Sequence, residues 1–197
     1  MTNKRVLHIT TSPRAASYSK GLSTAITDRL LSREVIDLTE RDLTKSPPPF
    51  PDELLTGAFY KDPATLTAQE QSLLRYADAV VADVSQADII VIGTPMYNLG
   101  MPAVLKAWID QLVRFGVTYD YDENFRRKCR FNGKTIYLAI ASGGRLADWP
   151  QGTEFIAAPV EAAFNAYVGT TTVRTFRVEG TAMPGFQPDY QQILADF

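Results

Sequence analysis

The fold of this chain is decided by residues 89–102, which read IIVIGTPMYNLGMP. The first four residues are apolar without any polar alternation, which is typical of a central parallel strand with both faces buried. Two glycines and two prolines follow within the next ten residues, and they constrain the backbone to an unusual path. Pro102 suits the first turn of a helix. Apolar residues then recur at helical spacing, and they are Val104, Leu105, Trp108, Ile109, Leu112 and Val113.

Strands and helices are predicted to alternate on both sides of this stretch. Four further apolar runs predict strands, and they span residues 6–9, 35–38, 136–140 and 173–178. Apolar residues at helical spacing predict three more helices, over residues 22–30, 67–84 and 153–167. Thr67 and Glu70 form a capping box at the start of the second of these helices. His8 lies inside the first strand, where we interpret it as a core histidine.

Some segments show weaker patterns. The proline-rich residues 46–51 are incompatible with a helix or a central strand, and residues 119–132 show no clear periodicity. The last predicted strand mixes arginine with apolar residues, which suits the edge of a sheet. Five strands separated by helices predict an α/β fold with a parallel sheet covered on both faces.

Composition excludes several classes of protein. The 197 residues suit one domain, spanning residues 1–197, with its own core. A net charge of −2 does not provide the basic face that nucleic acids require. Cys129 is the single cysteine, so neither a disulfide nor a cysteine-pair zinc site is expected. We find no signal peptide and no apolar run of about 20 residues, so we expect a cytoplasmic protein without membrane or metal partners.

The loop after the first strand, residues 10–19, is rich in hydroxyl groups and ends where a helix is predicted to begin. The free N–H groups and partial positive charge of a helix N-terminus attract phosphate. Ser12, Ser17 and Ser19 are therefore candidates for phosphate binding. Simple capping of the helix by Ser17 or Ser19 is the other interpretation, and the local sequence leaves both open. The loop has no glycine, which excludes the G-x-G-x-x-G and P-loop motifs.

Two further loops follow the third and the fourth predicted strands. The first of them contains Met96, Tyr97 and Asn98, which offer an apolar and aromatic wall for a flat ring. The second contains Gly143 and Gly144, which allow backbone N–H groups to approach a ligand closely. Each loop alone also fits an ordinary turn. Because ligands bind beyond the carboxyl ends of strands in such sheets, the three loops together predict a nucleotide site.

Five pieces of sequence in and around these loops form a specific set. They are Ser12-Pro13-Arg14, Ser17-Tyr18-Ser19, Pro95-Met96-Tyr97-Asn98, Leu105-Lys106-x-Trp108-Ile109-Asp110-x-x-x-Arg114-x-Gly116-Val117-Thr118 and Ser142-Gly143-Gly144. This set resembles the FMN-dependent NADH-azoreductase and NAD(P)H quinone reductase family, and the similarity covers nearly the whole chain. The resemblance implies a flavodoxin-like fold, with a doubly wound, five-stranded parallel sheet in the order 2-1-3-4-5 and helices on both faces.

The resemblance also implies an FMN-binding homodimer with two active sites at the subunit interface. It assigns the cofactor to residues of all three loops: Ser12, Ser17, Tyr18, Ser19, Met96, Tyr97, Asn98, Leu99, Ala141, Ser142, Gly143 and Gly144. Tyr121 and Phe164 are implied as walls of the substrate pocket. Relatives often have an aromatic residue in place of Leu99, and often an arginine in place of Ser142.

In the implied reaction the cofactor carries the chemistry, and no side chain acts as a nucleophile. We expect NADH or NADPH to give a hydride to the flavin N5 and leave, after which a quinone or aromatic azo compound accepts two electrons at the same place. Asn98 is expected to position the reactive edge of the ring. Two alternatives bind FMN as well: a flavodoxin-type electron carrier and a non-catalytic FMN-binding module. A carrier usually displays a strongly acidic surface, which a net charge of −2 does not supply.

Overall fold

A computed structural model describes residues 3–197 of the chain. Its strands are β1 (Lys4–Thr10), β2 (Ile36–Asp42), β3 (Ile89–Pro95), β4 (Tyr119–Tyr121), β5 (Arg127–Cys129), β6 (Lys134–Ala141) and β7 (Thr171–Val178). Its α-helices are α1 (Tyr18–Arg33), α2 (Glu53–Phe59), α3 (Ala68–Leu73), α4 (Arg75–Gln86), α5 (Ala103–Leu112), α6 (Ala157–Tyr167) and α7 (Tyr190–Ile193). Two 3-10 helices are η1 (Pro63–Thr65) and η2 (Leu146–Asp148). Each helix formed by residues 3–197 is too short or too polar to cross a lipid bilayer.

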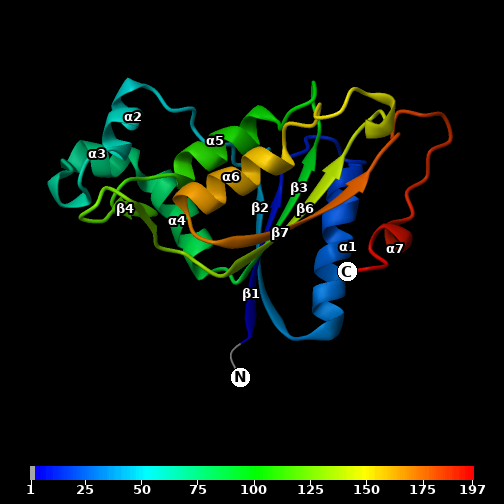
Figure 1. Cartoon of the computed structure of the whole chain (residues 1–197), viewed down its shortest axis with the longest axis horizontal. Coiled ribbons are helices and arrows are strands. Elements are labelled where there is room, and N and C mark those ends of the chain that lie inside the picture. The colour runs from blue at the N-terminus through cyan, green and yellow to red at the C-terminus, as the bar shows by residue number, and fades with distance from the viewer. Residues whose placement is uncertain (1–2) are drawn as a thin grey trace.

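The central sheet has five parallel strands in the order β2-β1-β3-β6-β7 (Figure 1). Counted along the sheet's own strands this is 2-1-3-4-5, so the predicted topology is confirmed. All seven residues of β3 are buried, as its unbroken apolar run predicts. β7 lies at an edge, also as predicted.

Helices cover both faces of this sheet. One layer consists of α1 and α7, and the other of α4, α5 and α6 (Figure 1). Alternate residues of β1 point to different layers: Val6 packs under α1, whereas Leu7 and Ile9 join the core under α4 and α5. Burying one such side chain contributes about 1.5–3 kcal/mol. The bulkiest buried side chains, Trp108 and Phe164, lie in the second layer.

The predicted helix over residues 67–84 is wrong in one respect, because it is broken into α3 and α4 at Leu74. The capping box of Thr67 and Glu70 is confirmed. Leu73 is 36% exposed, while the adjacent Leu74 is 1% exposed. The break turns Leu74 into a small core against α2. That contact joins residues far apart in the chain, so local periodicity could not predict it.

Three other details differ from the sequence prediction. Val35 precedes β2 and is 73% exposed. The helix α2 follows the proline-rich segment and is capped by Asp52, whose Oδ1 accepts a hydrogen bond from Leu55 N at 2.8 Å. The segment without periodicity contains the antiparallel pair β4–β5. In Figure 1, α2, α3 and β4 form the left end of the molecule.

His8 is confirmed as a hydrogen-bonded core residue. It is 3% exposed, its Nε2 lies 2.8 Å from Ser23 Oγ, and its Nδ1 lies 3.4 Å from Glu40 Oε1. Burial lowers the pKa of His8 below its usual 6.5, more strongly than the neighbouring Glu40 raises it. The folded protein therefore favours the neutral imidazole.

We expect this histidine to make the protein less stable at mildly acidic pH. Because the pKa is lower in the folded chain, the unfolded chain binds more protons once the pH falls below about 6.5. The free energy of unfolding should therefore decrease from pH 7 to pH 5. Asp42 and Glu70, with pKa values of about 2, do not titrate in this range. Urea unfolding at both pH values measures the effect, and His8→Asn should flatten it; an equal slope in that variant would contradict the assignment.

Candidate functional site

The three predicted loops meet at one edge of the sheet, the upper edge in Figure 1, because they follow the neighbouring strands β1, β3 and β6. Thr11 joins the first loop to the second: its N–H donates to Gly93 O at 3.1 Å, and its hydroxyl donates to Thr94 Oγ1 at 3.0 Å. Met96 N donates to Ala141 O at 2.7 Å and joins the second loop to the third. We call this joined surface the rim; it comprises residues 10–19, 93–102 and 141–145.

The first loop ends at the N-terminus of α1, where Ser17 is the cap. Its Oγ accepts a hydrogen bond from Lys20 N at 3.3 Å and lies 3.1 Å from Ser19 Oγ. Ser12 and Ser19 are buried. Of the two capping candidates it is thus Ser17 that caps. Capping still leaves N–H groups of the first turn, such as that of Tyr18, without an acceptor in the helix, and this donor set fits a phosphate.

Gly93 lets α1 lie directly against β3. A Cβ atom at this position would be 2.4 Å from Ser23 Oγ and 2.9 Å from the backbone O of Ser19. Real side chains do not approach this closely, so only glycine fits here without movement of the helix. The close contact fixes where the N-terminus of α1 sits relative to the second loop. The sequence shows the glycine but not this packing role.

The second loop turns sharply over residues 97–100. Tyr97 and Gly100 exchange two backbone hydrogen bonds of 3.0 Å, and Asn98 and Leu99 have φ angles of 48° and 70°. This is the pattern of a type I′ turn. Phe155 N holds the turn from outside by donating to Leu99 O at 2.9 Å. Tyr97 and Leu99 remain 42% and 38% exposed, so the turn presents apolar surface at the rim.

We expect Leu99→Gly to make the protein about 0.5–1 kcal/mol more stable. A left-handed backbone costs a residue with a Cβ about 1–2 kcal/mol, and the greater freedom of glycine in the unfolded chain offsets part of that gain. Strained residues of this kind gather at functional sites. Urea unfolding of the variant and the wild type measures the effect, and a destabilised variant would show that the turn is not strained.

The third loop is held from its inner side. Ser142 is buried, and its Oγ donates to Gly144 O at 2.7 Å, while Thr181 N donates to Ser142 O at 3.1 Å. Trp149 packs on Gly144, because a Cβ there would lie 2.5 Å from its ring. Gly143 is exposed. Of the predicted glycine pair, Gly143 is therefore the one that a ligand can approach.

An ion pair that the sequence did not reveal supports the second and third loops. Arg177 of β7 and Glu154 pair at 2.6 Å between Arg177 Nη2 and Glu154 Oε2. Glu154 Oε1 also accepts a hydrogen bond from Ala157 N at 2.7 Å, at the start of α6. Arg177 lines a small internal space together with Met96 and Ser142. The pair ties α6 and β7 to the underside of the rim.

The two predicted pocket walls do not reach the rim within this chain. Phe164 is 0% exposed and belongs to the core under α6, so it is a core residue without surface for a substrate. Tyr121 is 45% exposed, but it lies on β4 beyond the far end of α5. The ten residues of α5 span about 15 Å between the end of the second loop and the segment that leads to β4. Tyr121 instead packs against Tyr119, with ring centroids 5.9 Å apart.

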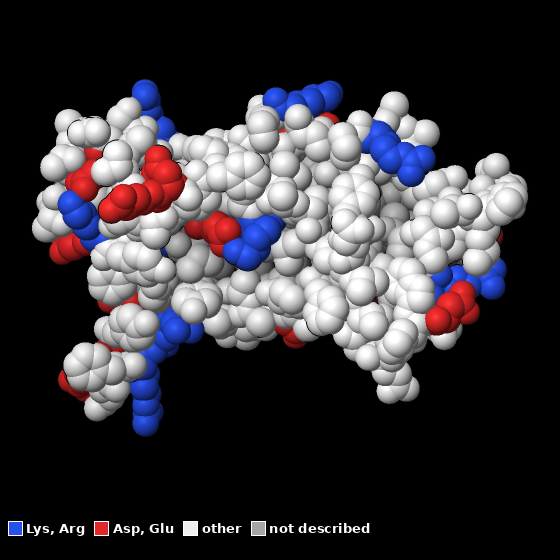
Figure 2. All heavy atoms as spheres, turned by 90° about the horizontal axis from the view of Figure 1, so that it is seen from above, with Lys and Arg blue, Asp and Glu red and all other residues white. Residues whose placement is uncertain are grey.

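Within residues 3–197, the face above the rim carries no strongly acidic area. Figure 2 looks down on this face and shows acidic groups that are small and separate, several of them beside basic groups. Uncharged residues cover most of its middle. A flat, uncharged ligand can therefore approach the rim without displacing a dense charge cluster.

Comparisons with known proteins place the chain among relatives of matching length. A family model described as the flavodoxin-like fold matches residues 4–197. An FMN-dependent NADH:quinone oxidoreductase of Dechloromonas aromatica is 36% identical over 181 residues, covering 91% of this chain and 89% of that protein. A protein of the same name from Jannaschia sp., numbered 1, is 47% identical over 131 residues, covering 66% of this chain and 65% of that protein.

Solved structures of similar fold cover nearly the whole chain as well. An azoreductase from Bacillus anthracis str. Sterne has a TM-score of 0.78 and 25% identity, covering 98% of this chain and 94% of its own. An FMN-dependent NADH-azoreductase from B. anthracis str. Ames Ancestor, solved in complex with FMN, has a TM-score of 0.77 and 21% identity, a likeness that shows the fold alone. The motifs predicted this relationship, and the match over nearly the full length confirms it: the chain belongs to the family of FMN-dependent NADH:quinone oxidoreductases, with a flavodoxin-like fold.

Proposed function

We propose that this protein is an FMN-dependent oxidoreductase that takes electrons from NADH and reduces quinones, and that it also cleaves aromatic azo compounds. The relatives are named for NADH and quinones, and the structural neighbours for azoreductase. The observation that carries the proposal is the rim, where hydrogen bonds from Thr11 and Met96 join three loops into one surface. NADPH is the alternative donor.

Each loop has a role in this proposal. Ser12 of the first loop, the cap residue Ser17, and Tyr18 and Ser19 of the first turn of α1 bind the phosphate. Residues 96–99 support the ribityl chain and the ring, and Asn98 orients the reactive edge. Residues 141–144 lie along the pyrimidine edge, where Gly143 presents its backbone. When bound, FMN supplies the chemistry of accepting a hydride from the donor and passing electrons to the acceptor.

We further propose that donor and acceptor use the same place in turn. Tyr97 and Leu99 form one exposed apolar wall at the rim, and two flat molecules cannot stack on one face of a ring together. The donor product must therefore leave before a quinone or azo compound enters. When both substrates are varied, we expect double-reciprocal plots of the initial rate to give parallel lines.

A homodimer with its active sites at the interface is part of the proposal. Tyr97, Leu99 and Phe155 expose apolar surface beside the rim, whereas the predicted wall residue Tyr121 lies far from the rim of its own chain. A second copy would cover the apolar surface beside the rim and supply walls to the pocket.

We also propose a cytoplasmic location, because a chain with a single cysteine does not depend on disulfides.

Anaerobic mixing of the FMN-loaded protein with NADH tests the function. We expect the flavin absorbance at about 450 nm to disappear within minutes and to return when a quinone is added. An electron carrier or a non-catalytic FMN-binding module would stay yellow with NADH alone. A protein that binds FMN but is not bleached would therefore contradict the proposed enzyme.

A further inference from the structure

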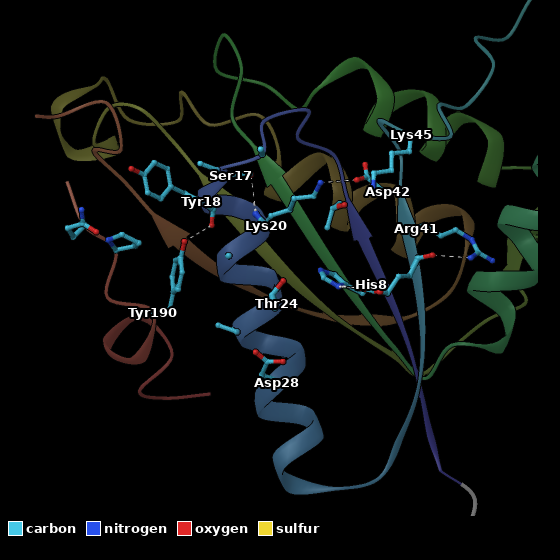
Figure 3. A pocket seen from close by; sticks show the side chains of 18 residues that line it. His8, Ser17, Tyr18, Lys20, Thr24, Asp28, Arg41, Asp42, Lys45 and Tyr190 are labelled. Carbon is cyan, nitrogen blue, oxygen red and sulfur yellow. Dashed lines mark hydrogen bonds and ion pairs between the residues drawn. The ribbon is translucent and has the colours of Figure 1, made fainter. Parts of the chain in front are cut away.

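A groove of about 970 Å³ runs along α1 next to the rim (Figure 3). The lining comes from β1, from Glu40 and Asp42 of β2, from Lys20, Thr24 and Asp28 of α1, and from Lys45 after β2. At its upper end it reaches residues 15–18, which also belong to the rim. Beyond α1 it extends to Tyr190 of α7. The groove therefore begins where the proposed phosphate site lies.

The groove contains charges of both signs. Lys20 Nζ pairs with Asp42 Oδ2 at 2.8 Å, and Asp42 Oδ1 accepts a hydrogen bond from the hydroxyl of Thr44 at 2.7 Å. The ion pairs found in residues 3–197 do not include Lys45 or Asp28. Ammonium groups bind phosphate, and carboxylates accept hydrogen bonds from sugar hydroxyls. This mixture suits a ligand that has both phosphates and a ribose.

The proposed reaction needs a place for such a ligand. NADH consists of two nucleotides, and only its nicotinamide has to reach the flavin ring. The adenosine diphosphate half extends away from the ring, and a groove that reaches the rim is a place where it can bind. Binding sites for small ligands typically have volumes of about 300–1,000 Å³, and the groove falls in this range. A neighbouring hollow of about 430 Å³ between β2 and α4 shares Glu40, Asp42 and Lys45 with the groove, but it includes no rim residue.

We propose that the groove between α1 and β2 binds the adenosine diphosphate half of NADH, with Lys45 near the diphosphate and the carboxylates of Asp28 and Glu40 near the ribose. This inference rests on the proposed function and adds a second subsite to it. Lys45, Asp28 and Thr24 are exposed, so they can be replaced without disturbing the core.

Kinetics with two donors test the subsite. Reduced nicotinamide mononucleotide carries the same nicotinamide as NADH but lacks the adenosine half. In FMN-loaded Lys45→Glu we expect the KM for NADH to rise at least about tenfold, as for loss of a charge-assisted hydrogen bond. The KM for the mononucleotide, kcat and FMN content should stay the same. Thr24→Trp, which fills the groove without changing charge, should give the same pattern, and Lys128→Glu on β5 is the matched charge control.

Three results would overturn the subsite. The first is an unchanged KM for NADH in both groove variants, and the second is an equal rise for the two donors. The third is loss of FMN from Lys45→Glu, which would assign the groove to the cofactor. If the wild type oxidises neither donor, the proposed function fails instead. Calorimetry with ADP-ribose then still tests the groove, because the wild type should bind it and Thr24→Trp should not.

Discussion

Ser17→Asp is expected to bind FMN on the order of 100-fold more weakly than the wild type, because it places a negative charge beside the phosphate. Ser17 caps α1 and lies at the end of the first loop. Aspartate is as good an N-cap as serine and interacts favourably with the helix dipole. The helix should therefore remain intact, and repulsion of the phosphate is the effect that is left.

Titration of the FMN-free variant with FMN measures this loss. Ser17→Asn is the matched control, because asparagine has nearly the size of aspartate, also caps helices, and carries no charge. We expect the asparagine variant to retain most of the affinity. If the aspartate variant bound FMN as the wild type does, the phosphate would have to lie away from the N-terminus of α1.

Gly93→Ala is expected to destabilise the fold by about 2–3 kcal/mol, near the upper end of the range for overpacked cores. The added Cβ would meet Ser23 Oγ at 2.4 Å and the backbone O of Ser19 at 2.9 Å. Ser19 belongs to α1, so relief requires the helix to move away from β3. FMN affinity should fall as well, since the first turn of α1 would shift relative to the second loop.

Gly57→Ala provides the comparison for this prediction. Gly57 lies in α2, and a Cβ there would have no neighbour within 4 Å. Alanine favours a helix by up to about 1 kcal/mol over glycine, so this variant should be as stable as the wild type or slightly more stable. Urea unfolding of both variants measures the difference. Equal stabilities for the two would show that α1 does not depend on contact through Gly93.

Much of the sheet could be predicted because its pattern is local. β3 and β6 read as unbroken apolar runs, since helices bury both of their faces. The capping box at Thr67 and Glu70 marked a helix start correctly, because its two hydrogen bonds form within one turn. Ser17 was one of two capping candidates, and only the backbone geometry of the loop distinguishes it from Ser19.

Features that depend on contacts between distant residues could not be predicted. The helix breaks at Leu74 to reach α2, and the strands β4 and β5 have only three residues each. The pair of Arg177 and Glu154 joins residues 23 positions apart. Phe164 was assigned to the pocket by family resemblance, whereas in this chain it packs in the core.

We propose that three loops distant in sequence together bind one FMN. The most direct test is titration of the FMN-free protein with FMN, monitored by absorbance. The titration compares the wild type with Ser17→Asp in the first loop and Gly143→Val in the third loop. We predict saturation at one FMN per chain for the wild type and much weaker binding for both variants. A wild type that does not bind added FMN, or variants that bind it as tightly as the wild type does, would contradict this proposal.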